Sequence, residues 1–366
     1  MKIAYKKLCE LVPTPGNPRN SEGDFIRLAS GEILFAFSRF SGDSWNDHAA
    51  SDICALYSPD GEHFDPADVR TLVTPDRFGG DNAMSVTLLP SQNGGISLYF
   101  GVKYDTKDLT AKPVRDEFFR IDSPDGYDFS GTPKLLFPQD HRGYFVVNND
   151  RVTVTSTGRI IIPASRHGQV FRDGRFQFLE AGTARFYRSD DGGETFRCGI
   201  SYAFPDPENQ HGLQEPGVVE LPDGRLYAYF RTDAGCQYES YSHDNGSTWT
   251  APAPSAFESP LSPMKIAKNP YNGKYYAVRN PIRNYPDSPE HPRYPNTWGR
   301  TPLAISESDD GVHFGEPVLL ESDLHYGYCY PAIYFLSEKE ALIAYCSGGV
   351  DLVPLQKTTI GRITFA

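Results

Sequence analysis

Glu215 and Arg231 are the two residues whose types and spacing most directly indicate chemistry. Each lies 8 residues from Asp223 (223−215 and 231−223), and Asp223-Gly224 is a typical hairpin turn between two apolar runs. The two side chains should therefore stand opposite each other at the open end of the hairpin. A guanidinium binds anionic groups through charge-assisted hydrogen bonds, and a neighbouring carboxylate can accept a proton. The pair therefore indicates a pocket at that end of the hairpin, unless Glu215 is simply the salt-bridge partner of Arg231.

The elements that must position such residues are indicated by a motif repeated five times, the Asp box. In each copy a serine is followed two residues later by an aspartate, then by glycine and an aromatic residue. The serine and aspartate side chains can bond the backbone of a tight turn, glycine supplies a positive φ, and the ring packs on the sheet. The boxes begin at Ser58, Ser123, Ser189, Ser242 and Ser308.

This repeat predicts an all-β fold, a six-bladed β-propeller of four-stranded antiparallel sheets. The box serines are 65, 66, 53 and 66 residues apart, which suits one sheet with its loops. Six blades of about 61 residues would use the whole chain, so we expect a single domain over 1–366. The last blade lacks a strand, and Lys6–Leu11 is expected to complete it beside Thr358–Phe365.

Blade topology then assigns each candidate residue to a face of the propeller. The turn between the first two strands of a blade and the Asp box share one face. Residues before the first strand, after the second strand or at the start of the third reach the opposite face. Six residues from four blades are therefore expected to converge there, near the axis: Arg19, Asp47, Glu215, Arg231, Arg300 and Tyr328.

Several of these assignments have rivals. Arg279 also follows a strand and competes with Arg300, while Asp43 and His48 share the polar loop of Asp47. An arginine at a strand end is usually solvated or ion-paired, and a tyrosine in an aromatic cluster is usually packed. Weaker candidates for ligand selection come from the second and third blades: Asp81, Asn82, Asn148, Asn149 and Arg166.

Composition narrows the possible partners. The formal net charge of −12 argues against nucleic acid or an anionic membrane as partner. The six cysteines show no C-x-x-C spacing, so neither a zinc site nor a dense disulfide framework is predicted, and we expect no metal and no cofactor. The chain lacks the apolar core of a signal peptide and any apolar run of about 18 residues, which favours a cytoplasmic protein unless a leader was removed.

With these residues in view, the sequence resembles the sialidase (neuraminidase) family, Asp-box or BNR-repeat propeller glycoside hydrolases, over essentially its whole length. Gln214–Arg231 looks like the family segment with the catalytic glutamate and the second carboxylate-binding arginine. Arg300 looks like the third arginine, Gly327-Tyr328-Cys329 looks like the segment of the tyrosine nucleophile, and Asp47 is similar in place to the acid/base.

The resemblance implies a retaining exo-glycosidase that hydrolyses a terminal sialic or related ulosonic acid from a sialylated glycan or free sialoside. Tyr328 would be the nucleophile, Glu215 its base, and Asp47 the acid/base. Most glycosidases use two carboxylates, whereas sialidases use a tyrosine as the nucleophile. The substrate carboxylate would be bound by Arg19, Arg231 and Arg300.

The sequence departs from the family in the first blade, where sialidases usually show Arg-Ile-Pro. Here the segment is Pro18-Arg19-Asn20, and Arg19 lies about two residues further from the turn than the family pattern implies. Two other functions remain open: a non-catalytic sugar-binding Asp-box propeller, and a propeller hydrolase or lyase acting on uronic acid glycans. A binding protein needs the arginines but not the tyrosine and glutamate pair.

Overall fold

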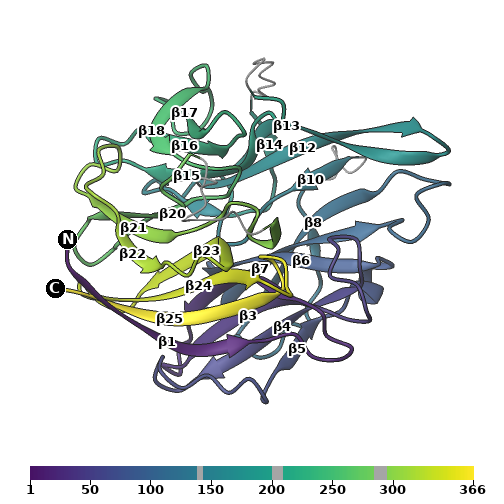
Figure 1. Cartoon of the computed structure of the whole chain (residues 1–366), viewed down its shortest axis with the longest axis horizontal. Helices are drawn as coiled ribbons and strands as arrows, with labels where there is room; N and C mark the ends of the chain where they lie inside the picture. Colours follow the sequence, from purple (N-terminus) through teal and green to yellow (C-terminus); the bar gives the residue numbers. More distant parts are fainter. Residues whose placement is uncertain (138–142, 200–208, 284–294) are drawn as a thin grey trace.

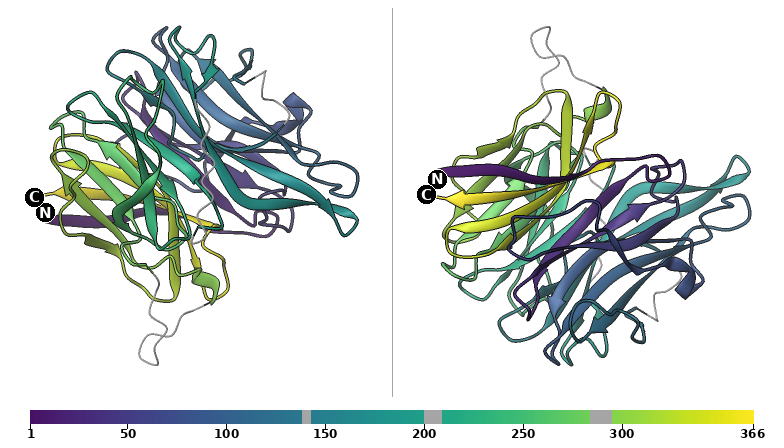
Figure 2. Two further views of the ribbon diagram at one scale, coloured as in Figure 1. Left: turned by 90° about the horizontal axis from the view of Figure 1, so that it is seen from above. Right: turned by 90° about the horizontal axis from the view of Figure 1, so that it is seen from below.

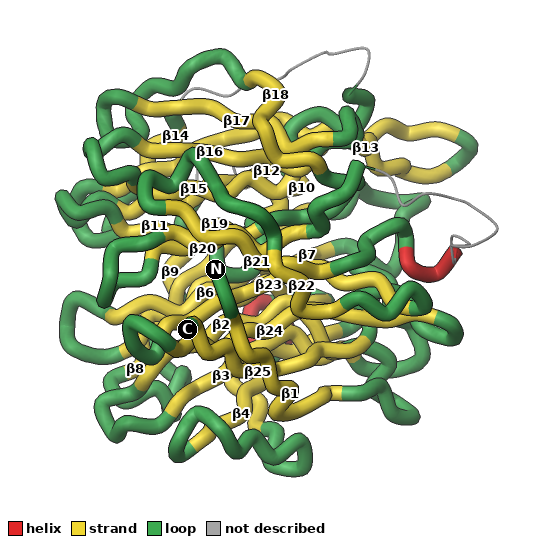
Figure 3. Tube along the Cα trace, turned by 60° about the vertical axis from the view of Figure 1, so that its left-hand side comes forward, coloured by secondary structure: helices red, strands yellow, loops and turns green. Residues whose placement is uncertain are grey.

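The computed structural model describes residues 1–137, 143–199, 209–283 and 295–366. These residues form six antiparallel sheets arranged as the blades of a propeller, which confirms the predicted all-β fold (Figures 1 and 3). Helix in this part of the chain consists of two short 3₁₀ segments, η1 (Pro75–Phe78) and η2 (Pro295–Thr297). Within the described ranges, no helix has the length and apolar character needed to cross a membrane.

Each of the first two blades is built from four strands that are consecutive in sequence. The first contains β2 (Asn20–Arg27), β3 (Ile33–Phe40), β4 (Ser51–Ser58) and β5 (Arg70–Val73), and the second contains β6 (Asn82–Pro90), β7 (Ile96–Tyr104), β8 (Arg115–Ser123) and β9 (Lys134–Leu135).

The third blade differs because two short strands, β10 and β11, share the inner position and both pair with β12. Its strands are β10 (Tyr144–Val146), β11 (Thr153–Val154), β12 (Ile160–Arg172), β13 (Arg175–Ser189) and β14 (Arg197–Cys198). The hairpin of β12 and β13 is long and extends beyond the body of the propeller (Figure 2).

The fourth and fifth blades return to four strands each. The fourth contains β15 (Gln214–Glu220), β16 (Leu226–Arg231), β17 (Cys236–Ser242) and β18 (Ala253–Glu258), and the fifth contains β19 (Lys265–Lys268), β20 (Tyr275–Arg279), β21 (Leu303–Ser308) and β22 (Val318–Glu321).

The two ends of the chain complete the sixth blade. Its strands are β23 (Tyr326–Phe335), β24 (Glu340–Gly349), β25 (Lys357–Phe365) and β1 (Ile3–Leu11). β1 pairs antiparallel with β25, so the predicted closure by the N-terminal strand is confirmed, and the termini lie side by side in Figures 1 and 2. Closure covers the edge that β25 would otherwise expose for pairing with another chain.

The Asp boxes form the predicted turns at the ends of the third strands. In the last copy the Ser308 hydroxyl donates to Asp310 Oδ1 at 2.9 Å and accepts from the Gly311 amide at 2.9 Å. Gly311 has a φ of 79°, in the left-handed region that favours glycine. The other four boxes repeat the bond from serine to aspartate and the bond from the glycine amide to serine.

A second repeated feature directs side chains toward the axis. In four inner strands the pairing register shifts at a β-bulge, and a residue in the bulge has a positive φ. Such conformations are uncommon for residues other than glycine, and bulges re-aim side chains near functional sites. The four residues are Glu22 (φ 56°), Ser85 (65°), Glu215 (47°) and Tyr330 (52°).

We predict that Ser308→Ala lowers the free energy of unfolding by about 1–2 kcal/mol, because a buried turn loses one hydrogen bond and leaves an amide unsatisfied. Thermal unfolding should show a Tm lower by about 2–4 °C. Asp309→Ala is the control, because this neighbour in the same turn is 88% exposed and should change Tm little. Equal Tm changes in the two variants would show that the box hydrogen bonds do not stabilise the blade.

Candidate active site

A pocket of about 380 Å³ lies where the inner strands converge. Its walls include the starts of β2, β6, β8, β10 and β15, the ends of β7 and β16, and residues of β12, β13, β23 and the loop between β3 and β4. The Asp boxes, in contrast, follow the ends of the third strands. The central pocket therefore opens on the face opposite the boxes, as the blade topology predicts. Its volume falls in the range typical of small-molecule sites.

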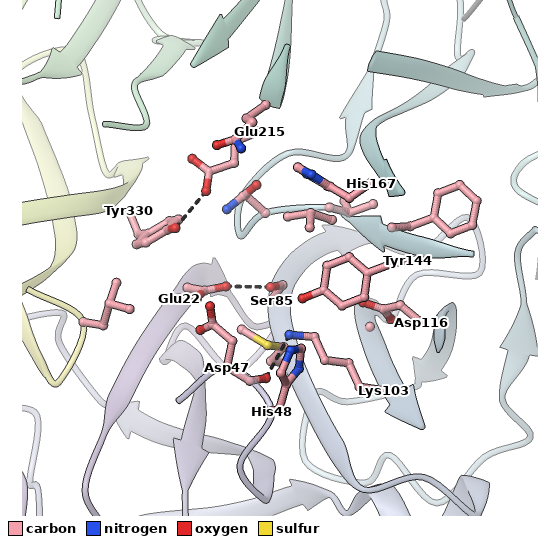
Figure 4. Close-up of a pocket in the computed structure, with 18 of the residues that line it drawn as sticks. Glu22, Asp47, His48, Ser85, Lys103, Asp116, Tyr144, His167, Glu215 and Tyr330 are labelled. Carbon is pink, nitrogen blue, oxygen red and sulfur yellow. Dashed lines mark hydrogen bonds between the residues drawn. The ribbon is translucent and has the colours of Figure 1, made fainter. Parts of the chain in front are cut away.

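Glu215, Arg231 and Tyr330 form a hydrogen-bonded group on one side of the central pocket. Arg231 Nη1 donates to Glu215 Oε1 at 2.7 Å, and the Tyr330 hydroxyl donates to the same oxygen at 2.8 Å (Figure 4). Glu215 is 7% exposed. Burial raises the pKa of Tyr330, and the charge of Glu215 raises it further, so Tyr330 is a neutral phenol in the free protein.

Arg300 adds a second guanidinium to this side. It precedes β21, and its guanidinium carbon lies 5.1 Å from the Trp298 ring centroid and 5.9 Å from that of Tyr330. Three buried polar atoms here have no hydrogen-bond partner among the described residues: Arg300 Nη1, Arg231 Nε and Glu215 Oε2. These three atoms are exceptions to the rule that buried polar atoms are hydrogen-bonded, which marks this side of the pocket as a candidate binding site.

Tyr328 does not face the central pocket, which corrects the sequence-based placement. It is 3% exposed and packs in an apolar cluster, with its ring 5.9 Å from that of Tyr345 in an edge-on arrangement. Its hydroxyl points to the Asp323 carbonyl oxygen at 3.5 Å. The bulge after Cys329 changes the alternation of β23, so Tyr330 takes the place expected for Tyr328.

A sequence signal for Tyr330 was present. Tyr330-Pro331 repeats the pattern of Glu215-Pro216, and in both pairs the residue before proline has a positive φ at the bulge. Comparing the inner strands of different blades at this dipeptide would have selected Tyr330 over Tyr328.

Arg19 is also placed differently from the expectation. It is fully buried behind the pocket wall, and its guanidinium carbon lies 4.3 Å from the Phe40 ring centroid. The neighbouring side chain that faces the pocket is that of Glu22, at the bulge of β2. The N–H groups of Arg19 bind Ser21 Oγ (2.8 Å), the Trp45 carbonyl (3.1 Å), Asp47 Oδ1 (2.5 Å) and Glu22 Oε1 (2.7 Å).

Asp47 and His48 face the pocket from the loop between β3 and β4, whereas the rival Asp43 is exposed and outside the lining. Lys103 Nζ fixes the loop by donating to the Asp47 carbonyl at 2.9 Å. The Asp47 side chain is 52% exposed, and although its partial desolvation opposes ionisation, Arg19 and then Lys103 outweigh this and hold its pKa well below the usual range. Burial lowers the pKa of His48 to about 4.

The pocket is also lined by four polar residues that sequence reasoning missed. They are Lys103, Asp116, Tyr144 and His167, and all four are buried (Figure 4). Burial raises the pKa of Asp116 to about 8, although the nearby charge of Lys103 opposes this shift. Lys103 lies in a strand that is otherwise mostly apolar, and Asp116 lies in a strand with several other charged residues, so neither stood out as a site residue.

Of the weaker candidates, some line the pocket and others hold in place the segments that line it. Asn148 lines the pocket, while the Asn149 amide donates to the carbonyls of Gly23 (2.9 Å) and Tyr330 (3.3 Å). Asn82 donates to the Ala49 carbonyl at 2.6 Å and so supports the loop of Asp47.

Asp81, Arg166 and Arg279 do not line the pocket. Asp81 pairs with Lys107 at 2.6 Å, and Arg166 is exposed beside Phe145. Arg279, the rival of Arg300, donates to the Glu258 carbonyl at 3.0 Å. Among the residues with described positions, no group of three or more His, Cys, Asp or Glu is arranged to hold a metal ion.

The chain belongs to the BNR repeat-like domain family, whose sequence profile matches residues 70–341, or 272 of the 366 residues (341−70+1). The resemblance to BNR-repeat propellers seen in the sequence is thereby confirmed. No curated protein sequence matches the chain.

Solved structures that are similar to the chain include several sialidases. A protein of unknown function from Dyadobacter fermentans superposes with a TM-score of 0.71 at 16% identity, covering 99% of both chains. A mutant of the NanB sialidase from Streptococcus pneumoniae gives 0.68 at 13% identity, covering 98% of this chain and 70% of that one. The leech intramolecular trans-sialidase gives 0.69 at 12% identity, with the same coverage. At these identities the likeness shows a common propeller fold.

We predict that Asp116→Asn changes how stability depends on pH. The folded protein keeps a proton on Asp116 that the unfolded chain releases above about pH 4. Stability from this group is therefore full below about pH 4 and is lost as pH rises toward the folded-state pKa of about 8. Relative to the wild type, the variant should gain on the order of a few kcal/mol between pH 5 and pH 8 in urea unfolding.

The control for this experiment is Asp43→Asn, which changes an exposed carboxylate of the neighbouring loop. Its stability curve should run parallel to that of the wild type. A parallel curve for Asp116→Asn as well would contradict a protonated Asp116 in the folded protein.

Proposed function

We propose that the protein is a sialidase-type glycoside hydrolase that removes a terminal sialic or related ulosonic acid from a glycan. The observation that carries this proposal is the Glu215 carboxylate, bonded both to Arg231 and to the Tyr330 hydroxyl inside the pocket. A sugar-binding protein needs the guanidiniums for a carboxylate but has no use for a tyrosine whose proton is directed at a buried glutamate. This pair therefore favours an enzyme over a binding protein.

Arg231 and Arg300 supply the carboxylate site in this proposal. Their unpaired Nε and Nη1 groups suit charge-assisted hydrogen bonds to a planar anion. In a sialic acid the carboxylate is attached to the anomeric carbon, so binding it places that carbon in the pocket beside Tyr330. The same carboxylate would repel an aspartate or glutamate nucleophile, and a phenol avoids much of this repulsion.

Tyr330 then acts as the nucleophile in place of Tyr328. Its oxygen attacks the anomeric carbon while its proton passes to Glu215 Oε1, and the bond to the leaving oxygen breaks. Water attacks in a second step, so two inversions give net retention. Asp47 is the sequence-predicted acid/base, but its bond to Arg19 keeps it ionised in the free protein. Proton donation by Asp47 would require release from Arg19.

Uronic acid glycans are the second candidate substrates. The observation that favours them is that the N–H groups of Arg19 are already bonded within the protein. This leaves two guanidiniums, not three, for a ligand carboxylate. A panel of fluorogenic sialosides with N-acetyl, N-glycolyl and deaminated sugars, assayed beside uronate oligosaccharides, separates the two. Release of uronate products without sialic acid would replace the sialidase proposal.

We predict that Tyr330→Phe abolishes detectable turnover, whereas Tyr328→Phe retains most of it, because only Tyr330 contacts Glu215. A 3-fluoro-sialosyl fluoride should leave a covalent adduct on Tyr330, which peptide mass spectrometry would locate. An adduct on Tyr328, or wild-type activity in Tyr330→Phe, would reject the assignment. The α-anomer of the free sugar should appear first by proton NMR.

We also predict that Arg300→Ala costs about 2–5 kcal/mol of transition-state binding, a loss of roughly 30-fold to several thousand-fold in kcat/KM. Arg279→Ala is the matched control, because this arginine lies one strand away and binds a backbone carbonyl outside the pocket. Methyl esterification of the substrate carboxylate should reduce wild-type turnover to a similar extent. Full activity on the methyl ester would exclude a carboxylate clamp.

A further inference from the structure

The central pocket contains a second hydrogen-bonded group that resembles Glu215, Arg231 and Tyr330. It also consists of a glutamate, an arginine and a hydroxyl, here the hydroxyl of Ser85. Glu22 Oε1 accepts from Arg19 Nη2 at 2.7 Å, and Glu22 Oε2 accepts from the Ser85 hydroxyl at 2.6 Å (Figure 4). Glu22 and Ser85 both line the pocket and both occupy bulge positions with positive φ. The pocket thus presents two buried carboxylates, each bonded to an arginine and to a hydroxyl from another blade.

The second group differs because two carboxylates share one guanidinium. Arg19 binds Glu22 through Nη2 and Asp47 through Nη1, so both acids bond the same guanidinium, and Lys103 is the second positive charge that acts on them. Like charges held this close favour a proton on one of them. Burial decides which one, because the Glu22 side chain is 4% exposed and that of Asp47 is 52% exposed. The buried acid loses more hydration on ionising.

Charged and titratable groups on several neighbouring elements surround Glu22. Besides Arg19 and Asp47, the charge of Lys103 on β7 acts on it, and its backbone amide donates to Cys346 Sγ on β24 at 3.4 Å. Burial raises the pKa of Glu22, opposed by Arg19 and reinforced by Asp47. The same surroundings hold the pKa of Asp47 low. Two acids whose environments separate their pKa values are typical of acid and base roles.

We propose that Glu22, acting through the Ser85 hydroxyl, supplies the proton to the leaving oxygen, a role that rests on the proposed glycosidase function. When Glu22 is protonated, its bond to Ser85 runs in the reverse sense, with Glu22 Oε2 as donor and Ser85 Oγ as acceptor. Glu22 Oε2 then gives its proton to Ser85 Oγ, and Ser85 gives its own proton to the glycosidic oxygen as the C–O bond breaks and its electron pair moves to that oxygen. Arg19 stabilises the Glu22 carboxylate that results. In the second step the attacking water returns a proton along the same path.

The position of Ser85 suits a relay. It lies on the pocket wall at the bulge of β6, and its backbone amide donates to Ser38 Oγ at 3.0 Å, which fixes its orientation. Figure 4 shows the Glu22 and Ser85 pair and the Glu215 and Tyr330 pair as separate hydrogen-bonded pairs that line one pocket. A nucleophile and a separate proton donor within one site are what cleavage of a glycosidic bond requires.

The test compares Glu22→Gln, Ser85→Ala and Asp47→Asn on two sialosides, one with an acidic phenol leaving group and one natural disaccharide. General acid catalysis contributes about 10²–10⁴-fold, and an acidic phenol needs little protonation. Glu22→Gln and Ser85→Ala should lose at least about 100-fold in kcat/KM on the disaccharide and under about 10-fold on the phenol. The alkaline limb of the wild-type pH–rate profile should disappear in Glu22→Gln.

The same experiments define the results that overturn the proposal. If Asp47→Asn shows the leaving-group dependence and Glu22→Gln and Ser85→Ala do not, Asp47 is the acid and the proposal is wrong. The fluorosugar must still label Tyr330 in Glu22→Gln, because fluoride leaves without protonation. Loss of labelling in both Glu22→Gln and Ser85→Ala would assign the pair to pocket structure and also overturn the relay.

A measurement independent of turnover separates this inference from the proposed function. The infrared difference spectrum between the wild type and Glu22→Gln should contain the carbonyl band of a protonated carboxylic acid at a pH above the usual pKa of a glutamate side chain. If the band is present but no sialoside or uronate is cleaved, the proposed function fails while the protonation of Glu22 stands. If turnover is normal and the band is absent, the proton relay alone is overturned.

Discussion

The left-handed backbone at the bulges of the inner strands is the constraint on which the site depends. Each such residue costs on the order of 1–3 kcal/mol unless its surroundings hold it. Here the surroundings are bonds between blades: Ser85 to Glu22 and Tyr330 to Glu215. The polar residues that line the pocket therefore also fix the conformations that present them, and closure of the ring by β1 keeps the blades that carry them in place.

The same bulges set the limit of what the sequence predicted. Asp boxes are local and repeated, so they indicated the blades and the face of each loop, and the structure brings Glu215, Arg231, Arg300 and Asp47 to one pocket. Strand parity near a bulge is not local, because one extra residue moves the next side chain to the other face. That shift exchanged Tyr328 for Tyr330.

Two further differences from the sequence-based expectation had another cause. Glu22, and not Arg19, faces the pocket, and several buried polar residues such as Lys103 line it. A buried ion pair cannot be read from one strand when its partners come from a loop and another blade, as Asp47 and Ser85 do for Glu22 and Arg19. Lys103 was hidden by a strand whose residues are all buried. In both cases tertiary contacts, and not the local pattern, decide which polar residue faces the ligand.

The charges of Arg19, Glu22 and Asp47 give a physical reason why the first blade departs from the sialidase pattern. Removing one partner of a buried ion pair leaves an uncompensated charge and costs more than replacing the whole group. Arg19 is fully buried and bonded to both Glu22 and Asp47, so changing either acid alone alters the electrostatic surroundings of the other acid and of Arg19. A ligand carboxylate could reach Arg19 only by displacing an acid already bound there. In the proposed function, the substrate carboxylate is therefore assigned to Arg231 and Arg300 and not to the blade-one wall.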